Sequence, residues 1–271
     1  MSKVLVVTSG KGGVGKTTTT AALGAALAQR GEKVVVVDFD VGLRNLDLVM
    51  GAERRVVFDL INVVQGVAKL PQALIRDKRL ENLWLLPASQ TRDKDALTEE
   101  GVGKVIDDLR DRFDWVICDS PAGIERGASM AMRFADEAVI VTNPEVSSVR
   151  DSDRIIGMLD SKTVRAEKGE HVQKHILITR YDASRAARGE MLTIDDILEI
   201  LATPLLGIIP ESQDVLKASN VGTPVTLSNA DGAPARAYMD AAKRLGGENV
   251  TMHVPAERRG FMDRLLRRRA A

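Results

Sequence analysis

The sequence predicts a single α/β domain, a doubly wound and mostly parallel sheet with helices on both faces. Short apolar, β-branched segments recur along the chain, and segments with helical spacing separate them. The short segments are apolar on both faces, which is typical of strands buried between two helix layers. Because strands and helices alternate over most of the 271 residues, one domain is favoured over two.

The elements follow in order along the chain. Strands are predicted at 4–7, 34–37, 83–86, 115–118, 138–142, 176–179 and 205–209. Helices are predicted at 17–30, 99–112, 147–160, 194–201 and 233–245, the first of them closed by Gly31 as a C-cap. The polar residues 161–174 are expected to form a surface loop. The domain is expected to span 1–246, followed by a linker at 247–255 and a basic tail at 256–271.

The charge of the chain is balanced overall but uneven along its length. Lys plus Arg and Asp plus Glu number 38 each, which argues against nucleic acid as a partner. The tail has six arginines, Glu257 and Asp263, and therefore a net charge of +4. Because the whole chain is neutral, residues 1–255 have a net charge of about −4.

Cys118 is the only cysteine, and it lies in an apolar segment. One cysteine excludes a disulfide framework within the chain and favours a buried thiol in a reducing compartment. An iron–sulfur cluster that bridges two subunits, with few ligands from each, stays open as an alternative. No apolar run reaches spanning length, and the N-terminus begins with a predicted strand instead of a signal peptide. We therefore expect a cytoplasmic protein unless another segment anchors it.

The segment GKGGVGKT at 10–17 matches the phosphate-loop pattern G-x-x-x-x-G-K-[ST]. A predicted strand precedes it and a predicted helix follows it, as the motif requires. Backbone N–H groups of such a loop point at phosphate, Lys16 would contact the β- and γ-phosphates, and the Thr17 hydroxyl would ligate Mg²⁺. The expected nucleotide contacts here are Gly10, Lys11, Gly12, Gly13, Val14, Gly15, Lys16, Thr17 and Thr18.

Acidic residues follow two of the predicted strands. Asp38 and Asp40 follow 34–37, and Asp119 follows 115–118. The carboxyl ends of strands line the ligand crevice in an open α/β sheet. A single aspartate at a strand end is often only a cap or turn residue, but two beside a phosphate loop indicate a Mg²⁺ site.

The second lysine of the loop, Lys11, resembles the extra lysine of the deviant Walker A ATPases. Longer stretches resemble the MinD family within that group: DFDVGLRNLDLVMG at 38–51, LPASQTRDKDAL at 86–97, CDSPAGIE at 118–125, TNPEVSSVRDSDR at 142–154, ITRYD at 178–182 and the basic tail. The resemblance runs over almost the whole chain.

The resemblance implies an ATP-dependent homodimer that encloses two ATP molecules. Lys11 of each subunit would then reach the phosphates of the other, which suits a mobile charge on a long stem. Lys11, Lys16 and Asp40 would be catalytic, with Asp40 orienting the attacking water. Asp38 and Asp119 would support Mg²⁺. A site without its second lysine should hydrolyse ATP slowly until the dimer forms.

The resemblance also implies further contacts with the nucleotide. Asn45 would lie in a switch segment that responds to the γ-phosphate, although an ordinary surface position is the alternative. Arg180 would flank the adenine, with Pro210 and Glu211 as the other wall. The preference for ATP comes from the resemblance, because the spacing of these residues does not separate adenine from guanine.

The predicted helix at 147–160 has charged residues beside apolar ones, and its periodicity alone indicates only a solvated face. In the MinD family the matching helix binds the division inhibitor MinC and the regulator MinE. The resemblance therefore implies that Asp151 and Asp153 contact such partners.

The basic tail forms an apolar stripe when 258–269 is placed on a helix. Such a short helix is marginal in water, so we expect it to form on an anionic membrane. The expected membrane contacts are Phe261, Met262, Leu265 and Leu266 on the stripe, Arg264 and Arg267 on the opposite, basic face, and Arg268. Asp263 interrupts that face and should weaken lipid binding. A helix docked on the body and a basic arm on nucleic acid are the alternatives.

Together these expectations describe an ATPase that binds the inner face of the cell membrane reversibly through its tail. There it would recruit a MinC-like inhibitor to block division-ring assembly away from mid-cell, while a MinE-like regulator stimulates hydrolysis. The alternative is a ParA-type DNA partition ATPase, against which the apolar stripe argues. Lys11 argues against a small-molecule kinase.

Overall fold

The structure is a computed structural model that describes residues 2–90 and 96–255. In this part of the chain one eight-stranded sheet has the order β3-β4-β2-β5-β1-β6-β7-β8. All neighbouring strands are parallel except β3 and β4. The strands are β1 (Lys3–Thr8), β2 (Val34–Asp38), β3 (Ile75–Arg76), β4 (Leu83–Leu86), β5 (Trp115–Asp119), β6 (Glu137–Thr142), β7 (Gln173–Tyr181) and β8 (Leu205–Pro210).

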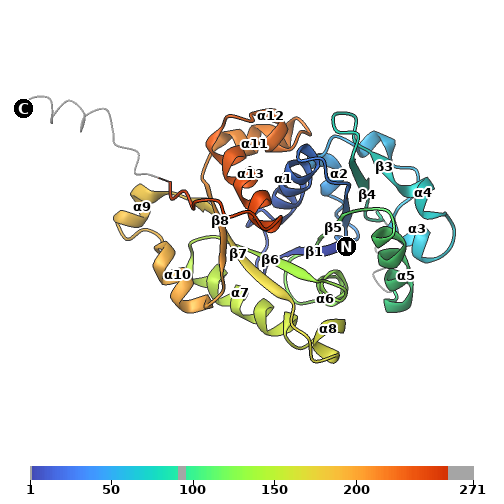
Figure 1. Cartoon of the computed structure of the whole chain (residues 1–271), viewed down its shortest axis with the longest axis horizontal. Helices are drawn as coiled ribbons and strands as arrows, with labels where there is room; N and C mark the ends of the chain where they lie inside the picture. Colours follow the sequence, from blue (N-terminus) through green and yellow to red (C-terminus); the bar gives the residue numbers. More distant parts are fainter. Residues whose placement is uncertain (1, 91–95, 256–271) are drawn as a thin grey trace, which may run out of the picture.

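Helices cover both faces of the sheet (Figure 1). They are α1 (Lys16–Gln29), α2 (Leu46–Val49), the 3₁₀ turn η1 (Glu53–Arg55), α3 (Leu60–Val64), α4 (Leu70–Ala73), α5 (Glu99–Arg110), α6 (Arg126–Met132), α7 (Val146–Leu159), α8 (Val164–Glu167), α9 (Ala183–Ala187), α10 (Ile194–Leu201), α11 (Gln213–Asn220), α12 (Val225–Ser228) and α13 (Ala233–Leu245). The predicted doubly wound α/β fold is confirmed.

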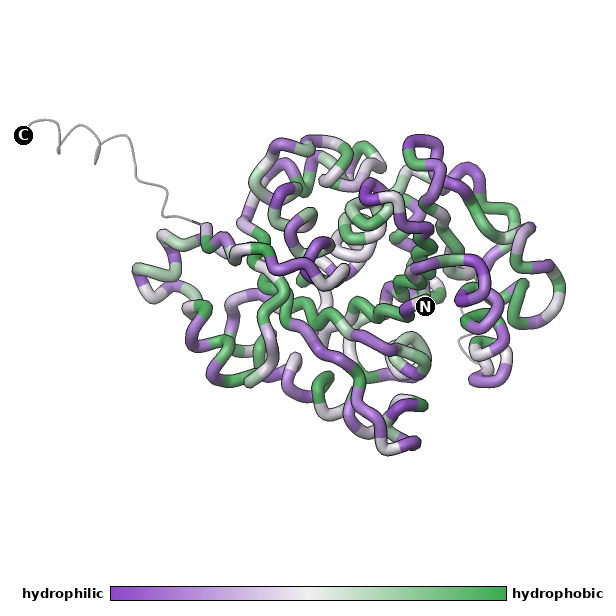
Figure 2. Tube along the Cα trace, viewed as in Figure 1, coloured by the Kyte–Doolittle hydropathy of each residue, from purple (hydrophilic) through white to green (hydrophobic). Residues whose placement is uncertain are grey.

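The core consists of two apolar clusters, one on each face of the sheet. Val4 and Val6 of β1 belong to the cluster under α5, α6, α7 and α10, whereas Leu5 and Val7 belong to the cluster under α1 and α13. Successive side chains of a strand point to opposite faces, so a strand between two clusters must be apolar throughout. The central strands are accordingly hydrophobic along their length in Figure 2.

The predicted elements are confirmed with small shifts at their ends. The predicted strand at 83–86 and the helices at 194–201 and 233–245 have the observed bounds. Gly31 follows α1 with a φ of 93°, as a C-cap glycine does. The expected loop at 161–174 is wrong in part, because it contains α8 and the beginning of β7. The sequence pattern did not predict the two-residue strand β3 or the short helices.

The C-terminal part of the chain is described only as far as residue 255. Helix α13 ends at Leu245, beside the predicted boundary at 246, and the division into domain, linker and tail stays a prediction. The membrane contacts predicted in 256–271 lie outside the described residues. None of the described helices combines the length and the apolar composition that crossing a membrane would require.

Two helical glycines should respond to alanine in opposite directions. A Cβ at Gly24, in α1, would lie 2.7 Å from Cγ1 of buried Val36, whereas a Cβ at Gly157, in α7, would have no neighbour within 4 Å. We expect G24A to lower the free energy of unfolding by about 1–2 kcal/mol, because overpacking exceeds the gain in helix propensity. G157A should raise it by about 0.5–1 kcal/mol. Urea unfolding followed by circular dichroism measures both; equal stabilities would contradict the close packing of α1 on β2.

Candidate functional site

The phosphate loop connects the carboxyl end of β1 to the first turn of α1. Gly15 is the N-cap of α1 and has a φ of 99°, which a side chain would oppose. Gly10 lies against α7, where a Cβ would come within 2.3 Å of the backbone oxygen of Asp151. The loop therefore requires glycine at Gly15 for its conformation and at Gly10 for a close approach of backbones.

Lys16 points into the protein. Its Nζ donates to Oγ of Ser9 at 3.0 Å, and the residue is only 7% exposed. Burial lowers the pKa of Lys16, and the nearby charges of Asp119 and Asp40 oppose that shift. A buried ammonium between a helix N-terminus and carboxylates suits a bound polyphosphate, because the phosphate oxygens supply the negative charge that burial demands.

Lys11, five residues earlier in the same loop, has different surroundings. Its Nζ donates to Oε2 of Glu145 at 2.8 Å and to Oγ of Ser147 at 3.1 Å. Its side chain is 41% exposed. The two lysines of one loop thus lie in separate environments: Lys16 is buried inside the loop, and Lys11 is at the surface beside the N-terminus of α7.

Asp38 and Asp119 end the neighbouring strands β2 and β5, and they are paired in the strand register. Both are buried, and burial raises the pKa of Asp38 well above its usual value and that of Asp119 to about 7. Their mutual repulsion adds to the shift at Asp38. The Thr20 hydroxyl donates to Asp119 at 3.0 Å, and the Thr17 hydroxyl also bonds it.

This carboxylate pair fits a divalent cation. Lys16 compensates these two buried carboxylates only in part, because the pKa of each is still raised, and Mg²⁺ prefers oxygen ligands of this type. Thr17, Asp38 and Asp119 are therefore the residues that would hold Mg²⁺, directly or through water. Their placement together agrees with the prediction, although their metal-binding role stays a prediction.

The segment after β2 is connected to this pair by hydrogen bonds. Asp38 accepts from the backbone N–H of Asp40 at 2.8 Å and of Leu46 at 3.2 Å. Asp40 is close enough for its charge to act on Lys16 and on both buried carboxylates. Asn45 is exposed at the N-terminus of α2, directly before Leu46. A movement of the Asp38 side chain would thus displace the start of α2, where Asn45 is the predicted switch residue.

A cavity of about 780 Å³ lies beside the phosphate loop, large enough for a nucleoside. Val14, Gly15 and Thr18 line one side, and the ends of β7 and β8 contribute Arg180, Pro210 and Glu211. Thr179 ties the two sides together, because its hydroxyl donates to the Val14 carbonyl at 2.7 Å.

Arg180 has a φ of 54°, an uncommon conformation for a residue with a side chain. Such a conformation costs roughly 1–2 kcal/mol and is found most often at binding sites. The residues predicted to flank the base therefore lie together at one cavity.

The predicted partner residues lie on α7 with different exposure. Asp153 is exposed, whereas Asp151 is half-buried against Gly10 and pairs with Arg154 at 3.6 Å. Their role toward a partner stays a prediction.

Sequence reasoning missed the residues that orient the functional ones: Ser9, Thr20, Glu145, Ser147 and Thr179. The adjacency of Ser9 to the loop was the one available signal.

Comparison with known proteins agrees with this geometry. Residues 5–225 match the CobQ/CobB/MinD/ParA nucleotide binding domain family. The septum site-determining protein MinD of Escherichia coli K12 is 61% identical over 270 residues, which cover 98% of this chain and 99% of that protein.

Two solved structures are also similar. In the MinC:MinD cell division protein complex of Aquifex aeolicus, a chain with 42% identity has a TM-score of 0.84, covering 93% of this chain and 99% of that one. The Pyrococcus horikoshii MinD complexed with Mg-ADP has 31% identity and a TM-score of 0.79, covering 90% and 96%. The phosphate loop, the cavity beside it and these similarities lead to one conclusion: the chain belongs to the MinD family of septum site-determining cell division ATPases.

Proposed function

We propose that the protein dimerises on ATP, binds an anionic membrane through its tail, and recruits an inhibitor of division-ring assembly. The observation that carries this proposal is the separation of the two lysines of the phosphate loop. Lys16 is buried where it serves the phosphates of its own site, and Lys11 lies at the surface, where a second subunit can reach it. One phosphate loop thus supplies a lysine to its own nucleotide site and a second lysine to the site of a partner subunit.

The contact that holds Lys11 within its own chain is weak enough to be exchanged. An exposed ion pair contributes about 0–1 kcal/mol, and Glu145 and Lys11 are both substantially exposed. The phosphates of a partner's ATP carry more charge than one carboxylate. Lys11 therefore transfers to the partner's site when two ATP-loaded subunits meet, and the dimer depends on ATP.

In the dimer the nucleotide is ATP with Mg²⁺, and the reaction is its hydrolysis to ADP and phosphate. Thr17, Asp38 and Asp119 would hold the Mg²⁺, which would neutralise negative charge that develops on the phosphates. Lys16 and the backbone of the loop bind the same phosphates, and Asp40 orients the attacking water. Because Lys11 reaches the site only in the dimer, hydrolysis is slow in the single subunit.

The membrane step depends on the tail at 256–271. Its net charge of +4 would contribute roughly 1 kcal/mol per charge near an anionic leaflet. The apolar stripe adds a few kcal/mol, and ordering the helix offsets much of this. One tail binds weakly and reversibly, whereas two tails on a dimer gain on the order of 10²–10⁴ in avidity. The ATP state thereby sets the membrane state.

The partner step uses the exposed face of α7. Asp153 is exposed there, and Asp151 links this face to the phosphate loop through its contact with Gly10. A solved complex of the related Aquifex aeolicus protein with MinC supports a MinC-like inhibitor as the partner. A MinE-like regulator binds an overlapping part of this face and stimulates hydrolysis, which releases the dimer from the membrane.

Membrane binding should need both ATP and the tail. We expect the full chain to co-sediment with anionic phospholipid vesicles in Mg-ATP, to stay largely in solution in Mg-ADP, and to lose binding when truncated before Ala256. Vesicles of neutral phospholipid are the control. Binding that ignores the nucleotide or the tail would contradict the proposal, and ATP-dependent, salt-sensitive binding to duplex DNA would instead favour a partition ATPase.

The two lysines should fail in different ways when substituted. K16A should lose nucleotide binding, because a buried phosphate contact is removed. K11A should bind ATP but form an ATP-dependent dimer at least roughly 30-fold more weakly, since removal of one charge partner typically costs 2–5 kcal/mol. Nucleotide fluorescence titration and sedimentation velocity measure the two steps.

K104A is the matched control, because Lys104 also forms an exposed ion pair, with Glu100 at 2.7 Å. It should leave both steps unchanged. A K11A protein that dimerises like the unsubstituted chain would refute the transfer of Lys11 between subunits.

A further inference from the structure

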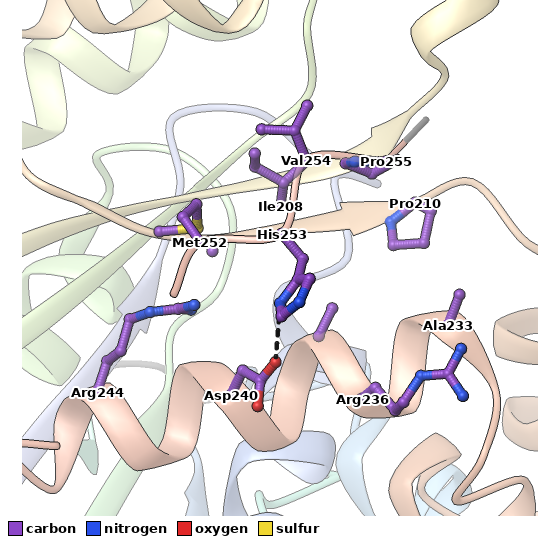
Figure 3. Close-up of a pocket in the computed structure, with 12 residues that line it drawn as sticks. Ile208, Pro210, Ala233, Arg236, Asp240, Arg244, Met252, His253, Val254 and Pro255 are labelled. Carbon is purple, nitrogen blue, oxygen red and sulfur yellow. Dashed lines mark ion pairs between the residues drawn. The ribbon is translucent and has the colours of Figure 1, made fainter. Parts of the chain in front are cut away.

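The segment between the domain and the tail contacts the domain. After α13 ends at Leu245, residues 246–249 are exposed, and the chain then turns back over α13. Residues 250–255, which we name the strap, run beside β8 with α13 on their other side (Figure 3). They contain no helix or strand. Pro255, the last described residue, lies at the end of β8 that carries Pro210 (Figure 3).

Arg244 anchors the strap to the sheet. Its Nη1 donates to the backbone oxygen of Leu206 on β8 at 2.7 Å. Its Nε donates to the backbone oxygen of Val250 at 3.1 Å, and its Nη2 donates to that of Thr251 at 2.8 Å. A planar guanidinium can satisfy three carbonyl groups at once, which a lysine cannot do in this geometry.

Other contacts of the strap are few. Met252 packs against the core, and Nδ1 of His253 lies 3.6 Å from Asp240, with the imidazole 80% exposed. A cavity of about 370 Å³ separates the strap from α13 and β8 over part of its length. Because the strap is not packed continuously, its position depends chiefly on the two hydrogen bonds that Arg244 donates to Val250 and Thr251, while the third bond holds Arg244 to β8.

We propose that Arg244 is a positioning residue for membrane binding, because it fixes the point at which the tail leaves the domain. This inference rests on the proposed function of the tail. With the strap anchored, only residues 256 and 257 separate the body from the predicted helix at 258–269. Without the anchor, the free segment begins at residue 249, because Glu248 still pairs with Arg30 and its backbone N–H still donates to the Lys243 carbonyl.

The length of this tether sets how readily the second tail of a dimer finds the membrane. Effective concentration falls roughly as the −3/2 power of tether length once the tether spans its sites. Freeing the strap should therefore weaken vesicle binding of the ATP-bound dimer roughly three- to tenfold. Binding of a single tail should change little, because its own contacts with lipid are untouched.

The test compares substitutions that separate charge from anchoring. R244Q removes both the positive charge and the planar guanidinium that bonds three carbonyl groups, whereas R244K keeps the charge and loses the guanidinium. R236Q is the matched control, because Arg236 lies on the same helix and cavity, and within residues 2–90 and 96–255 its hydrogen bond goes to the backbone oxygen of Asp231, outside the strap. Each full chain is titrated with anionic phospholipid vesicles in Mg-ATP, and thermolysin cleavage within 250–255 reports release of the strap.

We expect R244Q and R244K to be cleaved faster in the strap and to bind vesicles three- to tenfold more weakly, with ATP-dependent dimerisation unchanged. R236Q should match the unsubstituted chain. A Gly-Ser-rich insertion after Pro255, as long as the freed segment, lengthens the tether without touching Arg244, so it should reproduce the loss even if the Arg244 variants fold poorly.

Two results would overturn the inference. Vesicle binding that is unchanged in R244Q despite a cleaved strap, or unchanged after the insertion, would show that tether length does not matter. Weak binding by R236Q and R244Q but not by R244K would show that the charge itself contacts lipid. Failure of the unsubstituted chain to bind with ATP would instead refute the proposed function.

Discussion

The side-by-side burial of Asp38 and Asp119 is the constraint on which the rest of the site depends. Burial raises the pKa of both carboxylates, and the charge of Asp119 raises that of Asp38 further, so the fold gains little from the pair alone. Their position suits the Mg²⁺ site proposed beside the phosphate loop. The surrounding donors, from Thr17, Thr20 and the backbone of Leu46, hold the pair in place.

The strand order produces this pairing. β1 lies at the centre of the sheet, with β5 beside it and β2 beyond, so the phosphate loop and both aspartates emerge at one edge. The same order places β6 on the other side of β1, and the start of α7 therefore comes within reach of Lys11. Gly10 of the phosphate loop also packs against Asp151 of α7.

The sequence predicts what repeats locally and misses what the fold brings together from a distance. The buried strands, the long helices and the phosphate loop follow from apolar periodicity and glycine spacing. Glu145, in contrast, lies 134 residues from Lys11, and no local pattern reports their contact. The left-handed backbone of Arg180 and the two-residue strand β3 depend on tertiary packing, which outweighs local propensity. The strap at 250–255 has the composition of an ordinary linker, and only Arg244 distinguishes it.

One pair of helices connects the phosphate loop to the exit of the tail. α1 begins at Lys16 and packs along α13, where the Thr19 hydroxyl and the buried Tyr238 hydroxyl lie 3.0 Å apart. α13 ends next to Arg244, which binds both the edge strand and the strap. Because this interior is closely packed, Arg244 lies at a fixed place relative to the phosphate loop. A dimer closed around ATP would therefore present its two tails from equivalent, defined points, which is the geometry that avidity requires.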